Sequence, residues 1–140
     1  MIPLSFAQRR LWFLDRFEGP SATYNSAFAV WLGGELSVGA LELALGDVVG
    51  RHEVLRTVVV EGDDGVPYQR VLSLGEVGFR LPVVEVGGVE ERGAVLAEVS
   101  AACFDLAVDV PVRARLVRCG PGEHVLVLVV HHIAVDGESM

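Results

Sequence analysis

An unbroken run of aliphatic side chains, Val125 to Val130, constrains the fold of this 140-residue chain more than any other feature. Valine is stiff at its β-carbon and suits a pleated surface, and a run without polar interruption suits a strand covered on both faces. The next residues are His131 and His132, whose side chains must leave a continuing strand on opposite sides. The sequence therefore predicts a buried strand with one histidine facing the interior and the other facing the space beyond the strand end.

The residues that follow the histidine pair suggest a chemical interpretation. Asp136 and Gly137 predict a turn, because glycine tolerates backbone angles that other residues resist. An imidazole changes charge near neutral pH, so a histidine at a strand end beside a turn carboxylate is suited to proton transfer. Two such histidines can equally be buried, hydrogen-bonded groups without a reaction, and the residues themselves leave both interpretations open.

Other kinds of active site find less support in the pattern. Neighbouring strand histidines diverge and no further histidine or cysteine lies at ligand spacing, so we expect no metal site. The chain has no Gly-x-Ser-x-Gly turn, the usual setting of a nucleophilic serine in α/β hydrolases. The remaining interpretation is general acid–base catalysis by one imidazole.

Composition sets the outer limits of what the chain can do. Its 51% hydrophobic residues are enough for the core of one domain, and its net charge of −8 argues against nucleic-acid binding. No apolar run approaches the ~20 residues that span a bilayer, and the first residues do not resemble a secretory signal. We therefore expect no membrane partner and a cytoplasmic location. Cys103 and Cys119 lack disulfide or metal spacing and are expected to be small buried residues in a reducing compartment.

Three segments carry helix signals. Ser5 and Gln8 form a capping box, and the helix that they open is predicted to end at Gly19-Pro20. A second helix follows Ser37, and a third is predicted over Val89 to Cys103. The buried face predicted for the second helix consists of Val38, Leu41, Leu45, Val48, Val49 and His52.

The remaining apolar segments predict strands, without any repeat or linker that would divide the chain. A Gly-Asp-Asp-Gly turn at 62–65 joins two of them into a hairpin. Together with the three helices they predict an α/β fold with a mixed sheet and helices packed on it. The predicted strands are Tyr24–Leu32, Thr57–Glu61, Val66–Leu72, Phe79–Val86, Arg113–Arg118 and Val125–His131.

Three motifs, spread over the whole chain, resemble those of one family. The segment Leu4 to Leu14 (LSFAQRRLWFL) resembles the opening motif of condensation domains from nonribosomal peptide synthetases. Arg51 to Thr57 (RHEVLRT) resembles the second motif of these domains, and His131 to Gly137 resembles their HHxxxDG active-site motif. The order of the three motifs is also that of the family.

This resemblance implies both a fold and a reaction. The fold is similar to that of chloramphenicol acetyltransferase, with two lobes and a channel between them, and the chain corresponds to the N-terminal lobe. The reaction is peptide-bond formation between aminoacyl or peptidyl thioesters, each carried on the phosphopantetheine of a carrier domain. The implied partners are the upstream and downstream peptidyl carrier domains, an adenylation domain and the missing C-terminal lobe, and no cofactor is bound directly.

The resemblance also implies roles for individual residues. His132, the second of the pair, matches the catalytic histidine, and His131 then has a supporting role on the inward face. Asp136 matches a residue that holds the loop through an ion pair, and Gly137 matches the turn near the substrate. From the residues alone, Asp136 could simply cap the turn by accepting hydrogen bonds from nearby backbone N–H groups. Arg56 is a candidate ion-pair partner for Asp136, but from the sequence alone it could equally lie on a solvated face.

Finer expectations concern the subtype and the extent of the domain. A histidine pair distinguishes the chain from cyclisation domains, which carry two aspartates there, and the motifs most resemble domains that accept an L-configured donor. We expect residues 1–140 to form a truncated lobe that is inactive by itself. The alternatives are a non-catalytic remnant or docking module, and a free acyltransferase of the same superfamily that uses coenzyme A.

Overall fold

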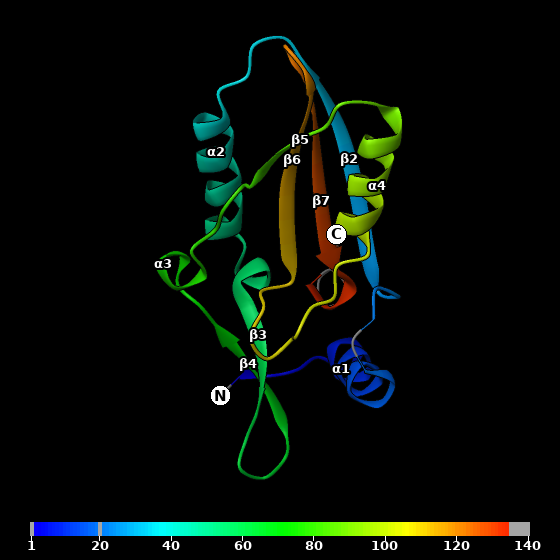
Figure 1. Ribbon diagram of the computed structural model, residues 1–140. Coiled ribbons are helices and arrows are strands. Elements are labelled where there is room, and N and C mark those ends of the chain that lie inside the picture. The colour runs from blue at the N-terminus through cyan, green and yellow to red at the C-terminus, as the bar shows by residue number, and fades with distance from the viewer. Residues whose placement is uncertain (1, 20, 135–140) are drawn as a thin grey trace.

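The computed structural model describes residues 2–19 and 21–134, which form two β-sheets and the helices packed on them. The main sheet has four strands, with β7 and β6 in its centre (Figure 1). Its pairs are antiparallel except for β5 and β6, which run parallel, so the predicted mixed sheet is confirmed. In spatial order its strands are β2 (Asn25–Gly33), β7 (Glu123–His131), β6 (Val112–Gly120) and β5 (Val83–Glu85).

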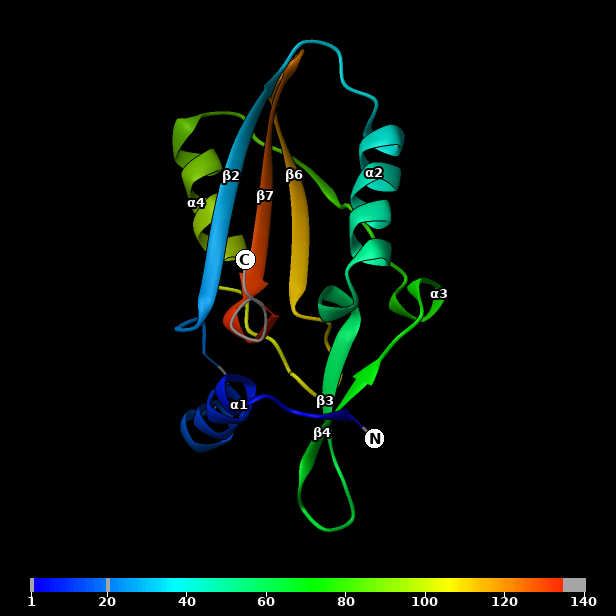
Figure 2. The same cartoon turned by 180° about the vertical axis from the view of Figure 1, so that it is seen from behind.

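A small second sheet lies beyond the end at which β7 finishes. The predicted hairpin forms its two longer strands, and the N-terminal residues add a short third strand. Helix α1 lies at the same end of the molecule, as both views of the ribbon show (Figures 1 and 2). The strands of this sheet are β1 (Ile2–Pro3), β4 (Pro67–Val71) and β3 (Thr57–Glu61).

Local signals fix the ends of the helices. In α1 the Ser5 hydroxyl accepts from the Gln8 N–H and the Gln8 side chain accepts from the Ser5 N–H, so the predicted capping box is present. The helix ends at Glu18 and is capped by Gly19, whose φ of 82° suits a residue without a β-carbon. The helices are α1 (Phe6–Glu18), α2 (Val38–Arg51), α3 (Leu74–Val77) and α4 (Val89–Ser100), and the 3₁₀ turns are η1 (Glu53–Arg56) and η2 (His132–Ala134).

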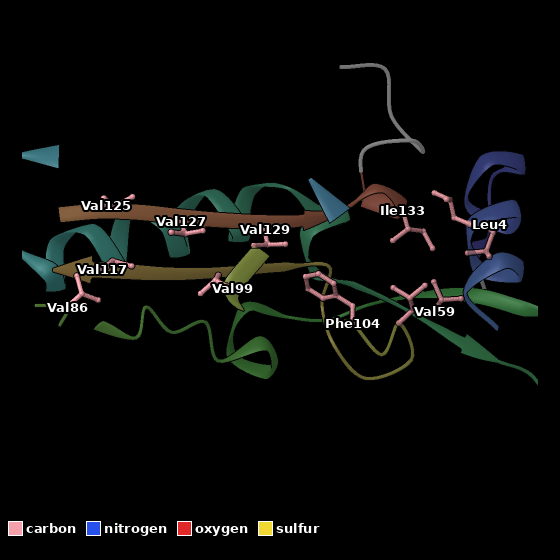
Figure 3. Packing of buried hydrophobic residues seen from close by; sticks show 12 residues of the cluster. Leu4, Val59, Val86, Val99, Phe104, Val117, Val125, Val127, Val129 and Ile133 are labelled. Atoms are coloured by element: carbon pink, nitrogen blue, oxygen red, sulfur yellow. The ribbon is translucent and has the colours of Figure 1, made fainter. Parts of the chain in front are cut away.

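The two faces of the main sheet are covered by different helices. Alternation along β7 places its odd-numbered valines with Val117 and with Val99 of α4 in one core, part of which is drawn in Figure 3. Its even-numbered residues face α2, whose apolar side chains cover Leu116 and Leu126. The long aliphatic run of β7 is therefore buried on both faces, as its composition predicts.

Two sequence-based expectations were wrong, and one helix was missed. The strand predicted over Phe79–Val86 is only Val83–Glu85, because the Leu81 N–H donates to Glu42 Oε2 (2.8 Å) instead of to a neighbouring strand. Helix α3 was not predicted, although Ser73 and Glu76 form a capping box for it. Cys103 lies beyond the end of α4 and is exposed, and Cys119 is only half-buried, so neither is a fully buried residue.

The predicted buried face of α2 is also only partly right. Val49 is buried and three other members pack against the core, whereas Val48 is 48% exposed. His52 caps the C-terminal end of the helix and is exposed, because its backbone has already left the helical conformation.

Candidate functional site

The candidate site lies where β7 ends and the chain turns into η2. The strand ladder continues as far as the pair Asn25–His131, so β2 and β7 both reach this point. His132 then begins the 3₁₀ turn, and its N–H donates to the Tyr24 carbonyl at 2.7 Å. Backbone hydrogen bonds on both sides of the histidine pair therefore fix where the two side chains start.

His131 points into the core and is 2% exposed. Its Nδ1 accepts a hydrogen bond from the Ile133 N–H at 3.0 Å, which requires that this nitrogen carry no proton. The ring stands edge-on to Phe104, with centroids 6.0 Å apart, and tilted against Tyr24 at 6.4 Å. His131 is thus held by packing and by a local hydrogen bond at the base of the turn.

His132 lies on the other face of the sheet and is half-buried. Its Nε2 is 2.8 Å from the Ser26 hydroxyl of β2, a hydrogen-bond distance. Ser26 pairs with Val130, two residues before His132, so alternation places both side chains on the same face. Ser26 carries no signal in the sequence, because only the strand register shows which residue of β2 contacts the histidine.

Helix α1 closes the end of the core beneath the turn. Leu4, Leu11 and Ile133 belong to the same buried cluster, and Figure 3 shows Leu4 and Ile133 close together. Trp12 packs against this cluster, whereas Phe13 is 63% exposed and is not a core residue. The opening motif thus supports the histidine turn from below.

Arg56 lies at the start of the small sheet and is half-buried. Its Nε donates to the Val49 carbonyl at 3.1 Å, and its Nη1 donates to the Leu72 carbonyl. The guanidinium therefore joins α2 to the residue that directly follows β4, and the solvated position considered for it is wrong. Asp136 and Gly137 lie outside the described residues, so their relation to Arg56 stays a prediction.

A hollow of about 920 Å³ lies at the opposite end of β7. His124 and Arg118 line it, and Arg118 Nε donates to His124 Nε2 at 3.3 Å. Because His124 is the second residue of β7 and His131 is its last, this hollow and the histidine pair belong to different ends of the sheet. Within residues 2–19 and 21–134, no three His, Cys, Asp or Glu side chains gather as metal ligands would, and no helix is long and apolar enough to cross a membrane.

Comparison with known proteins identifies relatives along the whole chain. The family model described as "Condensation domain" matches residues 1–140. A Salinispora arenicola protein named as a nonribosomal peptide synthetase, CymA, is 59% identical over 140 residues, which are 100% of this chain and 2% of that protein. The dimodular nonribosomal peptide synthase of Bacillus subtilis is 50% identical over 139 residues, which are 99% of this chain and 6% of that one.

Solved structures agree with this result. The crystal structure of the X-domain from teicoplanin biosynthesis superimposes with a TM-score of 0.83 at 39% identity, covering 94% of this chain and 28% of that one. The first condensation domain of the CDA synthetase has the same fold, with a TM-score of 0.81 at 21% identity over 94% of this chain and 35% of that one. The chain thus spans about a third of these solved chains and a small part of each synthetase.

Proposed function

The chain belongs to the condensation-domain family of nonribosomal peptide synthetases, with the chloramphenicol acetyltransferase-like fold, and on this premise we propose that it takes part in peptide-bond formation. The observation that carries the proposal is the end of β7, where His132 stands half-buried beside a hydroxyl while its neighbour is sealed in the core. A half-buried imidazole can meet a substrate, which a residue in the position of His131 cannot.

The proposed reaction joins two thioesters on phosphopantetheine arms. The α-amine of the downstream aminoacyl thioester attacks the carbonyl carbon of the upstream thioester, so that a C–N bond forms and the C–S bond breaks. The amine loses one proton, and the departing thiolate takes one up. The pKa of an α-amine is about 8, only about one unit above neutral pH, so roughly a tenth of the amine is already the free base that can attack. The larger demands are alignment of the two reactants and a place for the proton that leaves as the bond forms.

His132 is proposed to meet these demands as hydrogen-bond partner and proton acceptor for the attacking amine. Its position supports this role, because the β2–β7 ladder reaches His131 and the His132 N–H donates to the Tyr24 carbonyl. The proton that it accepts can then be returned to the thiolate, so the imidazole ends the cycle unchanged.

Supporting roles are proposed for four residues around this histidine. His131 holds the turn from the core side, where its Nδ1 accepts from Ile133. Arg56 joins α2 to the small sheet and stands as a candidate ion-pair partner for Asp136, and Gly137 is proposed to form the turn near the substrate. No metal ion or directly bound cofactor is required by this chemistry.

The chain is proposed to be the N-terminal lobe of such a domain, acting with a second lobe, two carrier domains and an adenylation domain. Large apolar side chains on β2 support the need for a further covering, since Phe28 is 56% exposed and Trp31 is 60% exposed. We propose that residues 1–140 alone are inactive for this reason. We also propose the L-donor subtype, which rests on the likeness of the motifs.

The test is a single substitution in the whole synthetase module that contains this chain. With donor and acceptor carriers loaded, His132→Ala should lower the single-turnover rate of amide formation by about 10²- to 10⁴-fold, the usual contribution of a general acid–base group. Carrier loading should not change. His52→Ala removes an exposed histidine at the end of α2 and should keep the original rate. A near-normal rate for His132→Ala would refute the proposal.

A docking module is the second candidate function. One observation favours it. Besides the X-domain structure that is 39% identical to this chain, a second solved structure, 36% identical, is described as a complex of the X-domain and OxyB from teicoplanin biosynthesis. A docking module would bind a partner protein and form no amide bond. The experiment above separates the two, because a docking module would show no amide formation even with the original sequence.

A further inference from the structure

The hydroxyl of Ser26 lies 2.8 Å from Nε2 of His132. We propose that Ser26 is a positioning residue for His132: it fixes the orientation of the imidazole and stabilises the ring when it holds a proton. The proposal rests on the proposed function of His132. It concerns a residue on a different strand, outside all three motifs that carry the family resemblance.

The position of Ser26 is fixed by the backbone around it. The neighbouring Asn25 donates from Nδ2 to the Ala102 carbonyl at 2.6 Å, which ties the start of β2 to the segment after α4. Ser26 itself lies in the continuous β2–β7 register, opposite Val130. The hydroxyl therefore sits on an anchored strand, whereas a half-buried imidazole without it could turn about its two side-chain torsions.

A serine hydroxyl suits this role because it can bond to either protonation state of the ring. In the neutral ring its oxygen accepts from Nε2–H, which leaves Nδ1 bare to take the proton of the amine, and in the protonated ring the same oxygen still accepts from Nε2–H. A hydrogen bond from a charged donor is about twice as strong as a neutral one. Ser26 therefore favours the imidazolium that forms when His132 takes the proton of the amine.

A serine beside a histidine could also be an activated nucleophile. In that role Ser26 would carry the upstream acyl group as an ester before the amine attacks. The positioning role needs no such intermediate, because the thioester is already activated and the amine can attack it directly. The two roles differ in one observable: a nucleophilic Ser26 would carry an acyl ester during turnover, and a positioning Ser26 would not.

The test uses two substitutions of Ser26 in the loaded synthetase module. Ser26→Ala should lower kcat for amide formation by about 10-fold, the effect of losing one hydrogen bond to a charged group, with KM for the acceptor carrier unchanged. Ser26→Thr keeps the hydroxyl and suits a strand, so it should restore most of the rate. Ser21→Ala, which removes a hydroxyl bonded to Thr23, is the matched control and should keep the original rate.

A double substitution shows whether Ser26 acts through His132. In a His132→Ala background, Ser26→Ala should cause no further loss, because the group that it positions is absent. An equal loss in both backgrounds, or no rescue by threonine, would overturn the proposal. So would an acyl group on Ser26, detected by mass spectrometry of the peptide that contains it.

The same set of variants separates this proposal from the proposed function. If His132→Ala keeps the rate, the function proposed for His132 is wrong and Ser26 has nothing to position. If His132→Ala loses activity while Ser26→Ala does not, only the role of Ser26 is wrong.

Discussion

His131 and His132 are consecutive residues of the same type, yet the structure places them in opposite surroundings. His131 is 2% exposed and stands edge-on to Phe104 in the core. His132 is half-buried on the other face, with Nε2 at the Ser26 hydroxyl. The difference follows from strand alternation, and it separates a residue that holds the turn from one that can meet a substrate.

The two faces of the main sheet differ in the same way. Helix α4 lies over the face of Val125, Val127 and Val129, which are at most 1% exposed. On the other face α2 covers Leu116 completely, but farther out on β2 the side chain of Phe28 is 56% exposed. The face that carries His132 is thus closed on the side of β6 and open on the side of β2.

The largest expected effect tests the contrast between the two histidines. His131→Ala should lower the free energy of unfolding by about 4 kcal/mol, because it leaves a cavity the size of an aromatic ring and removes the acceptor of the Ile133 N–H. His132→Ala should lower it by less than about 1 kcal/mol, as is usual for a residue outside the core. Urea unfolding of the complete condensation domain that carries this chain measures both. Equal losses would mean that the two positions do not differ in burial.

A second pair of substitutions tests the open and closed parts of one face. Leu116→Ala should cost about 3 kcal/mol, since Leu116 is fully buried under α2, and Phe28→Ala should cost a similar amount, since a second lobe is proposed to cover Phe28 in the complete domain. The same unfolding measurement applies. A loss below about 1 kcal/mol at Phe28 would show that no other part of the complete domain covers this strip of β2.

How far the sequence predicted the structure depends on whether each signal was local. The capping box at Ser5 and the apolar run of β7 lie in one segment each, and both predictions were confirmed. The strand expected at Phe79 was mostly wrong, because its backbone bonds to Glu42 of α2, which is distant in sequence. Helix α3 was not predicted, although its Ser73–Glu76 capping box is a local signal.

The candidate site shows the same limit. Motif likeness pointed to the histidine pair, and strand alternation predicted that its members face opposite ways. Ser26 could not be predicted, because its contact with His132 depends on the register between β2 and β7. The partners of Arg56 are main-chain carbonyls, which carry no signature in a sequence.

A third prediction concerns α1, which supports the histidine turn through Leu11 and Ile133. Ser5→Ala removes one half of a capping box and should cost about 1 kcal/mol. Ser37→Ala is the matched control at the start of α2, where the hydroxyl accepts from Ala40 at 3.3 Å in a single bond, and it should cost less. Unfolding measurements in which Ser37→Ala is the more damaging of the two would contradict this order.

The smallest expected effect lies on the same helix and depends on pH. Burial raises the pKa of Asp15 above its usual value, and the negative charge of Asp105 raises it further, against the opposing effect of Arg16. A raised pKa means that the folded state holds the proton more firmly than the unfolded state does. The folded state therefore loses stability as the pH rises through the range in which Asp15 ionises.

Asp15→Asn cannot ionise, so the variant should be more stable than the original protein at neutral pH. The gain should be only a few tenths of a kcal/mol, since solvent screens a partly exposed group, and it should vanish below about pH 4, where carboxyl groups are protonated. Glu18→Gln removes the same charge from the exposed end of α1 and controls for the net charge of −8. The difference between the two variants, followed by thermal unfolding from acid to neutral pH, isolates the contribution of burial. An equal gain for both would assign the effect to net charge. The partial burial of the Asp15 carboxylate against the core would then not lower the stability of the folded state.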